Sequence, residues 1–344
     1  MESTDTPITP QRAQLLGQLA AERAFLLLRL EGVGEEALTH DPVFEGWTIA
    51  GLLAHLAYWD AFAADRLMKL AEGRVSDIRP LDSHDTIEGR NQAMQARFAG
   101  LTFSQGLAMS QKERRGLRLA LARVTDAMLE TPVRLRPGRQ STPRIWARWS
   151  ARHDAQHAAD LARWRANYPP NHPSLRVIHR DLLPPLLSLS RHEFMALAAL
   201  IPAAERETRP IEGQWTLKQV MGHIIDYEMM GIVALAAIDA GREPEYESTI
   251  PDSDAFNSLQ ADGWQARPWA EVWSLHQQVR QTLRQLAGRL DDAALARPFV
   301  APWLGTTTAC GFLLDMAQHE QEHADDLRRV LGVKPLPRRL GRAG

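Results

Sequence analysis

Six histidines fall into two sets of three, and their spacing suits a divalent metal ion. The sets are His55, His153 and His157 in the first half of the chain, and His223, His319 and His323 in the second. The last two members of each set are four residues apart, so on a helix they direct two imidazoles at one point. Three neutral imidazoles leave a coordination position open, where a metal polarises a water, a thiol or a carbonyl group. The pattern predicts one metal site in each half.

The two halves are copies of one domain. Gly46-Trp47-Thr48-Ile49 matches Gln214-Trp215-Thr216-Leu217, and each tryptophan precedes the first histidine of its set by eight residues. The segments after the histidine pairs also agree, Ala158-Ala159-Asp160-Leu161 against Ala324-Asp325-Asp326-Leu327. The offset between the copies is 168 residues at the tryptophans and 166 at the histidine pairs, which one small loop deletion explains. We infer duplication of a whole domain.

Acidic residues beside the histidine pairs offer hydrogen-bond acceptors for the imidazole rings. They are Asp154 and Asp160 in the first copy, and Glu320 and Asp326 in the second. Such carboxylates fix the orientation and the tautomer of a ligating histidine. For Asp160 and Asp326 we favour another interpretation, a surface ion pair with the arginine three residues later, Arg163 or Arg329.

Two further motifs suggest chemistry less directly. The segment from His319 to His323 satisfies the H-E-x-x-H pattern of zinc proteases. A zinc protease needs this helix beside the edge of a sheet, and the sequence shows no evident sheet. A basic run could hold a carboxylate or phosphate beside the first site, although a solvated helix face is the favoured interpretation. The run comprises Arg134, Arg136, Arg139, Arg144, Arg148 and Arg152.

The other candidate residues are interpreted as structural or incidental. Trp47 and Trp215 precede helix N-caps, where an apolar residue packs on the first turn. Tyr58 and Asp226 are equivalent positions that differ, so the two sites are expected to hold different ligands. The single cysteine, Cys310, has no counterpart in the first copy and fits a catalytic nucleophile poorly. The remaining histidines have no matched partner: His40, His84, His172, His179, His192 and His276.

Apolar residues recur at spacings of three and four, which predicts an all-α protein made of two tandem four-helix bundles. The long helices of the first copy are predicted over 10–30, 48–72, 104–129 and 143–167, with a short helix over 89–98. Those of the second copy are predicted over 174–201, 216–240, 268–290 and 306–331. We expect the first domain to span 1–168, the second 174–333 and a basic tail 334–344, with a proline-rich linker after residue 168.

The composition limits the class of protein. The 344 residues are 44% hydrophobic and 24% charged, which excludes wholesale disorder and a collagen-like repeat. The longest apolar run, Met229 to Ile238, is about half of what spans a bilayer. Forty basic and 42 acidic residues nearly balance, so we expect no nucleic-acid partner and no membrane partner. One cysteine and no secretory signal favour the cytoplasm, and two halves that pair internally are compatible with a monomer.

Three motifs together carry a family resemblance. They are Trp-Thr-x₆-His on one helix, the segment Pro302-Trp303-Leu304-Gly305-Thr306-Thr307, and the late His-x₃-His helix. They resemble the DinB-like superfamily of four-helix bundles, which includes the bacillithiol-transferase type, the N-terminal domain of mycothiol-dependent maleylpyruvate isomerase and self-protection proteins of the colibactin-resistance type. The resemblance covers almost the whole chain as two copies. It implies that the six histidines of the two sets are the metal ligands.

Two hypotheses for function remain open, because one bundle fold hosts several chemistries. The first is an enzyme whose divalent metal (zinc, nickel or iron) activates a low-molecular-weight thiol or a water for attack on an electrophilic small molecule. The second is a non-catalytic self-protection protein that sequesters a small molecule or a metal. We favour the enzyme, a transferase or hydrolase, and an exchangeable stoichiometric metal would support it.

Overall fold

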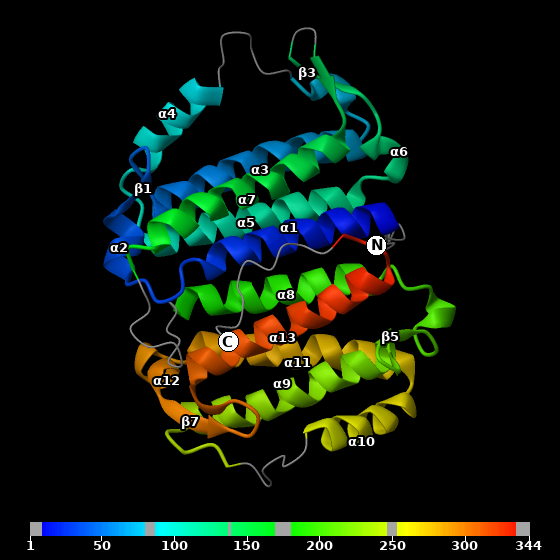
Figure 1. Cartoon of the computed structure of the whole chain (residues 1–344). Coiled ribbons are helices and arrows are strands. Elements are labelled where there is room, and N and C mark those ends of the chain that lie inside the picture. The colour runs from blue at the N-terminus through cyan, green and yellow to red at the C-terminus, as the bar shows by residue number, and fades with distance from the viewer. Residues whose placement is uncertain (1–8, 80–86, 137–138, 169–179, 246–252, 335–344) are drawn as a thin grey trace. The chain divides into compact units, whose positions relative to one another are not determined.

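Helices form most of the chain (Figure 1). The computed structural model describes residues 9–79, 87–136, 139–168, 180–245 and 253–334. The chain divides into two compact units, Met1–Tyr168 and Pro169–Gly344. The prediction of an all-α protein with two tandem helical bundles is confirmed. Most of the predicted linker and of the basic tail lies outside the described residues.

The first unit is a bundle of four long helices. They are α1 (Pro10–Leu28), α3 (Ile49–Ala71), α5 (Phe103–Arg123) and α7 (Pro143–Arg165). Helix α1 packs on α5 and α7, and α3 packs on the same two helices, so the four surround one core. Shorter elements lie in the connections: α2 (Glu35–His40), the 3₁₀ turn η1 (Val75–Asp77), α4 (Ile87–Phe98) and α6 (Asp126–Leu129).

The second unit repeats this arrangement. Its long helices are α8 (Leu183–Ala198), α9 (Leu217–Asp239), α11 (Trp269–Arg289) and α13 (Ala309–Val330). Helices α8 and α9 each pack on both α11 and α13. The shorter elements are η2 (Arg180–Leu182), η3 (Ala203–Glu205), α10 (Ser253–Gln265) and α12 (Asp292–Ala296). Among the described helices, α9 alone is long and apolar enough to cross a membrane, and 67% of its apolar window is buried as in a core helix.

Each unit also holds two antiparallel hairpins, so the expectation of no sheet was wrong at these places. In the first unit β1 (Pro42–Phe44) pairs with β2 (Trp47–Thr48), and β3 (Val133–Arg136) pairs with β4 (Arg139–Ser141). In the second unit β5 (Pro210–Glu212) pairs with β6 (Trp215–Thr216), and β7 (Pro298–Ala301) pairs with β8 (Gly305–Thr308). Strands of two to four residues are too short to show the alternation that identifies a strand in a sequence.

The predicted long helices are mostly right, with one break. The helix expected over 104–129 is two helices, α5 and α6, because Val124 has an extended backbone and Thr125 starts a new turn. The hydroxyl of Thr125 accepts a hydrogen bond from the backbone N–H of Met128, which is the mark of an N-cap. Helix α10 of the second unit was not predicted.

Capping side chains set where the histidine-bearing helices begin. Thr48 and Thr216 cap α3 and α9, each by accepting a hydrogen bond from a backbone N–H of the first turn. Thr308 caps α13 in the same way, and α7 begins at Pro143, a residue that suits the first turn because it has no N–H to satisfy. A hairpin ends directly before α3, α9 and α13, and another ends at Ser141, just before α7. Each histidine therefore lies at a fixed position along the chain from a hairpin.

Candidate metal centres

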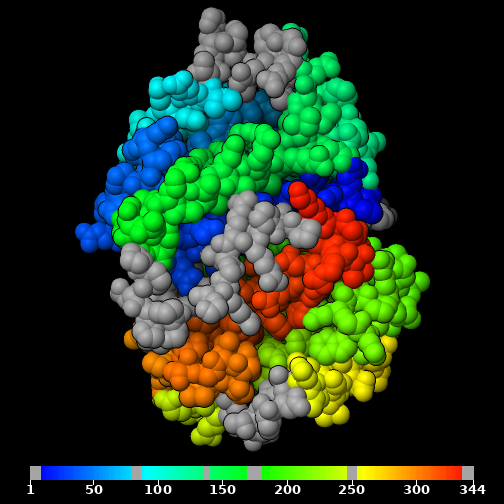
Figure 2. Space-filling view, viewed as in Figure 1, coloured from blue at the N-terminus to red at the C-terminus, as the bar shows by residue number. Residues whose placement is uncertain are grey.

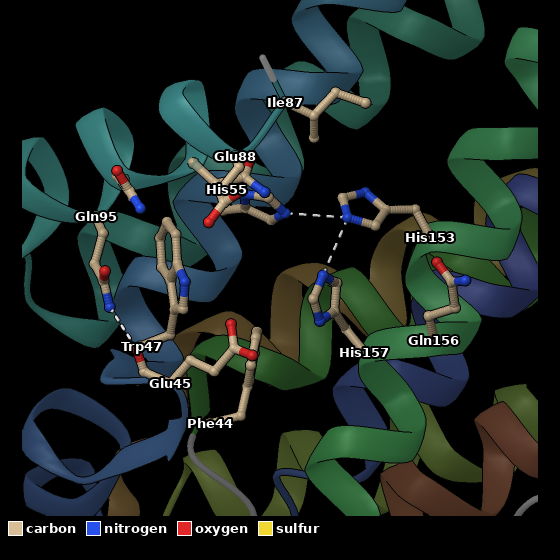
Figure 3. A pocket seen from close by; sticks show the side chains of 12 residues that line it. Phe44, Glu45, Trp47, His55, Ile87, Glu88, Gln95, His153, Gln156 and His157 are labelled. Carbon is tan, nitrogen blue, oxygen red and sulfur yellow. Dashed lines mark hydrogen bonds between the residues drawn. The ribbon is translucent and has the colours of Figure 1, made fainter.

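The first set of histidines meets at one point inside the first unit (Figure 3). His55 comes from the second turn of α3, and His153 and His157 come from the middle of α7. The Nε2 atom of His153 lies 3.0 Å from Nε2 of His55 and 3.0 Å from Nε2 of His157. The three nitrogens lie close enough together to hold one metal ion. The structure therefore brings together all three ligands that the sequence predicts for the first copy.

The second set repeats this geometry in the second unit. His223 lies on α9, and His319 and His323 lie on α13. The Nε2 atom of His319 is 2.9 Å from Nε2 of His223 and 3.0 Å from Nε2 of His323. The ring of Tyr227 packs against both His223 and His319. All six predicted ligands thus belong to two clusters of the same form.

In the first set, the protons of the imidazole rings favour a cation at the point of convergence. A neutral imidazole has one N–H and one lone pair. Nδ1 of His157 lies 3.0 Å from a carboxylate oxygen of Asp160, which places the proton on Nδ1 and leaves a lone pair on Nε2. One proton on His153 cannot satisfy the lone pairs of both neighbours, whereas a divalent cation accepts all three. The separations are also near the roughly 3.4 Å expected between tetrahedral nitrogen ligands at zinc distances.

Burial keeps the histidines of the first set neutral. Removal from water and repulsion from His157 lower the pKa of His55 to about 3 and that of His153 to about 2. Burial also lowers the pKa of His157, against the opposing effect of Asp160. Neutral rings offer lone pairs without first releasing a proton, as metal binding requires.

The second set differs in one ring. Burial lowers the pKa of His223 to about 3. Burial acts in the same direction on His323, but the carboxylates of Asp326 and Glu212 outweigh it and raise the pKa of this ring to about 9. Nδ1 of His323 lies 2.9 Å from Glu212 and 3.7 Å from Asp326. His323 is therefore protonated at neutral pH and gives the second cluster a positive charge. A metal ion must displace this proton in order to bind the ring.

The acidic residues next to the histidines do not act as the sequence analysis expected. Asp154 and Glu320 are fully buried and bind arginines of the core rather than the histidine rings. Asp160 and Asp326, which we interpreted as partners of arginines, do pair with Arg163 and Arg329, and each also faces a histidine ring. Asp154 and Glu320 face away from the rings because a residue one position after a ligand points about 100° away around the helix.

A buried network of two arginines and two carboxylates lies in the core of the first unit. Arg23 donates two hydrogen bonds of 3.0 Å to the two oxygens of Asp154 and a third of 3.0 Å to Asp60. Arg114 donates to both oxygens of Asp60 at 2.8 and 3.1 Å, and its guanidinium lies 2.8 Å from Asp154. All four side chains are almost completely buried, so each charge depends on its partners.

The second unit contains the same network at equivalent positions. Arg191 and Arg280 bind Glu228 and Glu320. His276, which we interpreted as incidental, is fully buried beside this network, with Nε2 3.8 Å from Glu320. Sequence reasoning missed these residues, although the offset between the copies places Arg191 at the position of Arg23 and Arg280 at that of Arg114. Charged residues repeated at equivalent core-facing positions were the signal.

A cavity of about 650 Å³ opens beside the first histidine set. Phe44 and Trp47 of the β1–β2 hairpin and Glu88 of α4 contribute to its wall. The ring of Phe44 stacks on His157 with centroids 5.2 Å apart, and Trp47 packs on His55. Trp47 thus contacts a predicted ligand as well as the first turn of its helix. Sequence reasoning missed Phe44, and its counterpart Glu212 in the second copy, although both occur three residues before a tryptophan of the duplicated motif.

Other candidates do not join a site. Part of the first unit's surface in Figure 2 is formed by α7. Arg148 and Arg152 of this helix are exposed, and neither lines the cavity. Arg144 forms an ion pair with Glu130, and the side chains of Arg136 and Arg139 lie outside the description. Cys310 is 2% exposed. The Glu320 of the H-E-x-x-H pattern is held by arginines in the core, so it is not placed to act as the base of a protease.

Comparison with known proteins gives one result. A search of curated proteins and a search of solved structures each found no significant match. The family model described as the DinB superfamily matches the chain twice, over residues 18–161 and 186–327. Each match contains one complete histidine set and one complete arginine–carboxylate network. The chain is therefore a member of the DinB superfamily with two tandem copies of the domain.

Proposed function

We propose that the protein is a metal-dependent enzyme that acts on an electrophilic small molecule, by thiol transfer or by hydrolysis. The observation that carries the proposal is the convergence of three Nε2 atoms in each copy, at 2.9–3.0 Å from the central histidine. Zinc, nickel or iron suits such an imidazole set. A divalent metal held there lowers the pKa of a bound thiol or water and so supplies a nucleophile at neutral pH.

The surrounding residues have roles that follow from their contacts. Asp160 holds the Nδ1 proton of His157 and so directs its lone pair inward. Phe44 and Trp47 cover two of the three rings, which excludes water from that side of the site. The cavity leaves space for a small molecule beside the rings. We propose that substrates enter the first copy through this cavity.

Metal analysis of untagged protein tests the proposal. We expect two equivalents of a divalent metal per chain and one equivalent in the double variant His319→Ala/His323→Ala, because each cluster draws its ligands from one unit. His192→Ala, an exposed histidine on α8, is the matched control and should keep both equivalents. A chain that takes up neither zinc, nickel nor iron would contradict the proposal.

A second measurement distinguishes catalysis from sequestration. The metal-loaded protein is incubated with 2-mercaptoethanol and 1-chloro-2,4-dinitrobenzene, a thiol and an electrophile, and release of chloride is followed over time. Turnover that disappears in His55→Ala and His223→Ala together supports an enzyme. Full metal occupancy with no more product than one equivalent per chain, across thiol and water nucleophiles, would support the sequestering protein instead.

A further inference from the structure

The wall of the cavity beside His55, His153 and His157 is acidic. Glu45 and Glu88 line it, and among the described residues that form its wall there is no lysine or arginine. We propose that this cavity selects small molecules that carry an amine and discriminates against carboxylates and phosphates. This inference deepens the proposed function and rests on it, because the metal at the histidines is the second anchor for such a ligand.

Glu45 occupies a conformation that is unfavourable for a residue with a side chain. Its φ is +45°, in the turn between β1 and β2, and the next residue, Gly46, has a φ of +79°. The second copy has Gly213 at the position of Glu45, also with positive φ. The side chain of Gln95 donates a 2.8 Å hydrogen bond to the backbone carbonyl of Glu45 and holds the turn against α4. Strained residues of this kind concentrate at functional sites.

The rest of the wall also suits a cation with an apolar body. Phe44 and Trp47 present aromatic faces, which attract a positive charge as well as an apolar group. Four other side chains of the wall are amides, whose oxygens accept a hydrogen bond from an N–H and which carry no charge. They are Asn91, Gln92, Gln95 and Gln156. Among the described residues of the wall, Glu45 and Glu88 are therefore the charged side chains.

Arginines that are near the wall residues in sequence, such as Arg90, Arg97 and Arg152, do not line the cavity. Arg90, two residues after Glu88, donates a 2.6 Å hydrogen bond to the hydroxyl of Tyr58 and does not line the cavity. Arg163 pairs with Asp160, and Arg152 is exposed on the outer side of α7. In the part of the wall that the structure describes, an anionic ligand would thus meet two carboxylates and no lysine or arginine, while an amine would meet two carboxylate partners.

Three thiols that share a two-carbon chain and end in an ammonium, a hydroxyl or a carboxylate group test the inference. They are cysteamine, 2-mercaptoethanol and 3-mercaptopropionate, and their affinities are measured at pH 7 from the thiolate-to-metal absorption of cobalt-loaded protein. The His319→Ala/His323→Ala background restricts the signal to the first site. We expect cysteamine to bind at least fivefold more tightly than 3-mercaptopropionate, and 2-mercaptoethanol to fall between them. The difference should shrink at high salt.

Because the three thiols also differ in acidity, the decisive quantity is the change in their affinity ratio when the carboxylates are removed. Glu45→Gln/Glu88→Gln should lower the ratio of cysteamine to 3-mercaptopropionate at least threefold. Glu36→Gln, an exposed glutamate of α2 outside the cavity wall, is the control and should leave the ratio unchanged. An equal ratio in the wall variant and the parent would overturn the inference.

Cobalt content is measured on each sample first, which separates the two proposals. If cobalt binds and the ratio ignores the wall variants, the inference fails and the proposed function stands. If cobalt does not bind, the proposed function fails, and the cavity is titrated in the metal-free protein with 2-phenylethylamine and 3-phenylpropionate. Preference for the amine that is lost in Glu45→Gln/Glu88→Gln then supports the inference, and equal binding of both probes overturns it.

Discussion

Equivalent residues perform different tasks in the two copies. Phe44 stacks on His157, whereas Glu212, at the same position of the second copy, lies 2.9 Å from Nδ1 of His323. The exchange of a ring for a carboxylate explains why the pKa of His157 is lowered while that of His323 is raised to about 9. Two clusters with the same three ligands therefore differ in charge before any metal binds. We expect metal uptake by the second cluster to be the more pH-dependent of the two.

Asp226 gives a prediction at the same scale. It accepts a 2.7 Å hydrogen bond from the indole N–H of Trp264, and burial raises its pKa from 3.8 to about 6. The folded protein therefore binds this proton more tightly than the unfolded chain does, so stability falls as pH rises from about 4 to 6. Asp226→Asn keeps the acceptor oxygen without the charge. It should raise the free energy of unfolding at pH 7 by about 1–2 kcal/mol.

Denaturant unfolding of metal-free protein at several pH values measures this effect. The gain from Asp226→Asn should shrink as pH falls from 7 to 5, because the parent carboxyl then takes up its proton. Glu271→Gln, an exposed glutamate paired with Arg267, serves as control with little effect at any pH. A gain of the same size at pH 5 and pH 7 would mean that the charge of Asp226 is not its source.

At the scale of elements, the contact between α3 and α5 depends on a glycine. A Cβ added to Gly106 of α5 would lie 2.4 Å from the backbone oxygen of Ala50 on α3. Backbone cannot yield as the end of a side chain does, so Gly106→Ala should force the two helices apart and cost about 2–3 kcal/mol. Gly116 lies on the same helix with nothing within 4 Å of an added Cβ.

Thermal unfolding of the two alanine variants tests this packing. Gly116→Ala should be neutral or stabilising by up to about 1 kcal/mol, because alanine favours the helix and meets no obstacle. Gly106→Ala should also lower metal occupancy of the first cluster, since α3 carries His55. Equal effects of the two substitutions would exclude the close approach of α3 and α5.

Features that depend on patterns within the sequence could be predicted, whereas most contacts between distant residues could not. The histidine pairs and the capping threonines are local patterns, and the duplication is a direct repeat of the sequence. Together they predicted the long helices and the residues of both clusters. Asp154 was misinterpreted because its neighbour along the chain, His153, faces the site, while its own partner Arg23 is 131 residues away. The hairpins were missed because their strands are short and their role depends on contacts such as Phe44 with His157.

For the whole molecule, the arrangement predicts two separate thermal responses to metal. Each cluster takes its ligands from one compact unit, and a ligand that binds only the folded state stabilises it by about 2.7 kcal/mol at a hundredfold excess over Kd. Zinc or nickel added to metal-free protein should therefore raise the melting temperature of each unit by several degrees. Differential scanning calorimetry resolves the two responses.

Ligand variants assign those responses to the units. His55→Ala should abolish the rise of the first unit and His223→Ala that of the second, while each variant barely changes the metal-free protein. His40→Ala, on the exposed surface of α2, should change neither response. An unchanged melting temperature at saturating zinc would remove the support for the metal clusters as well as for the assignment.

The buried arginine–carboxylate networks bear on how the two copies could diverge after duplication. In each unit two positive and two negative groups cancel, and the loss of one partner strands a charge in the core at a cost of about 3–5 kcal/mol. At these positions the copies differ only in the length of the acidic side chain, with Asp60 and Asp154 in one and Glu228 and Glu320 in the other. At these sites the two copies therefore differ by one methylene group and not by the sign of a charge. While the surroundings of the two histidine sets became different, each interior kept two positive and two negative side chains.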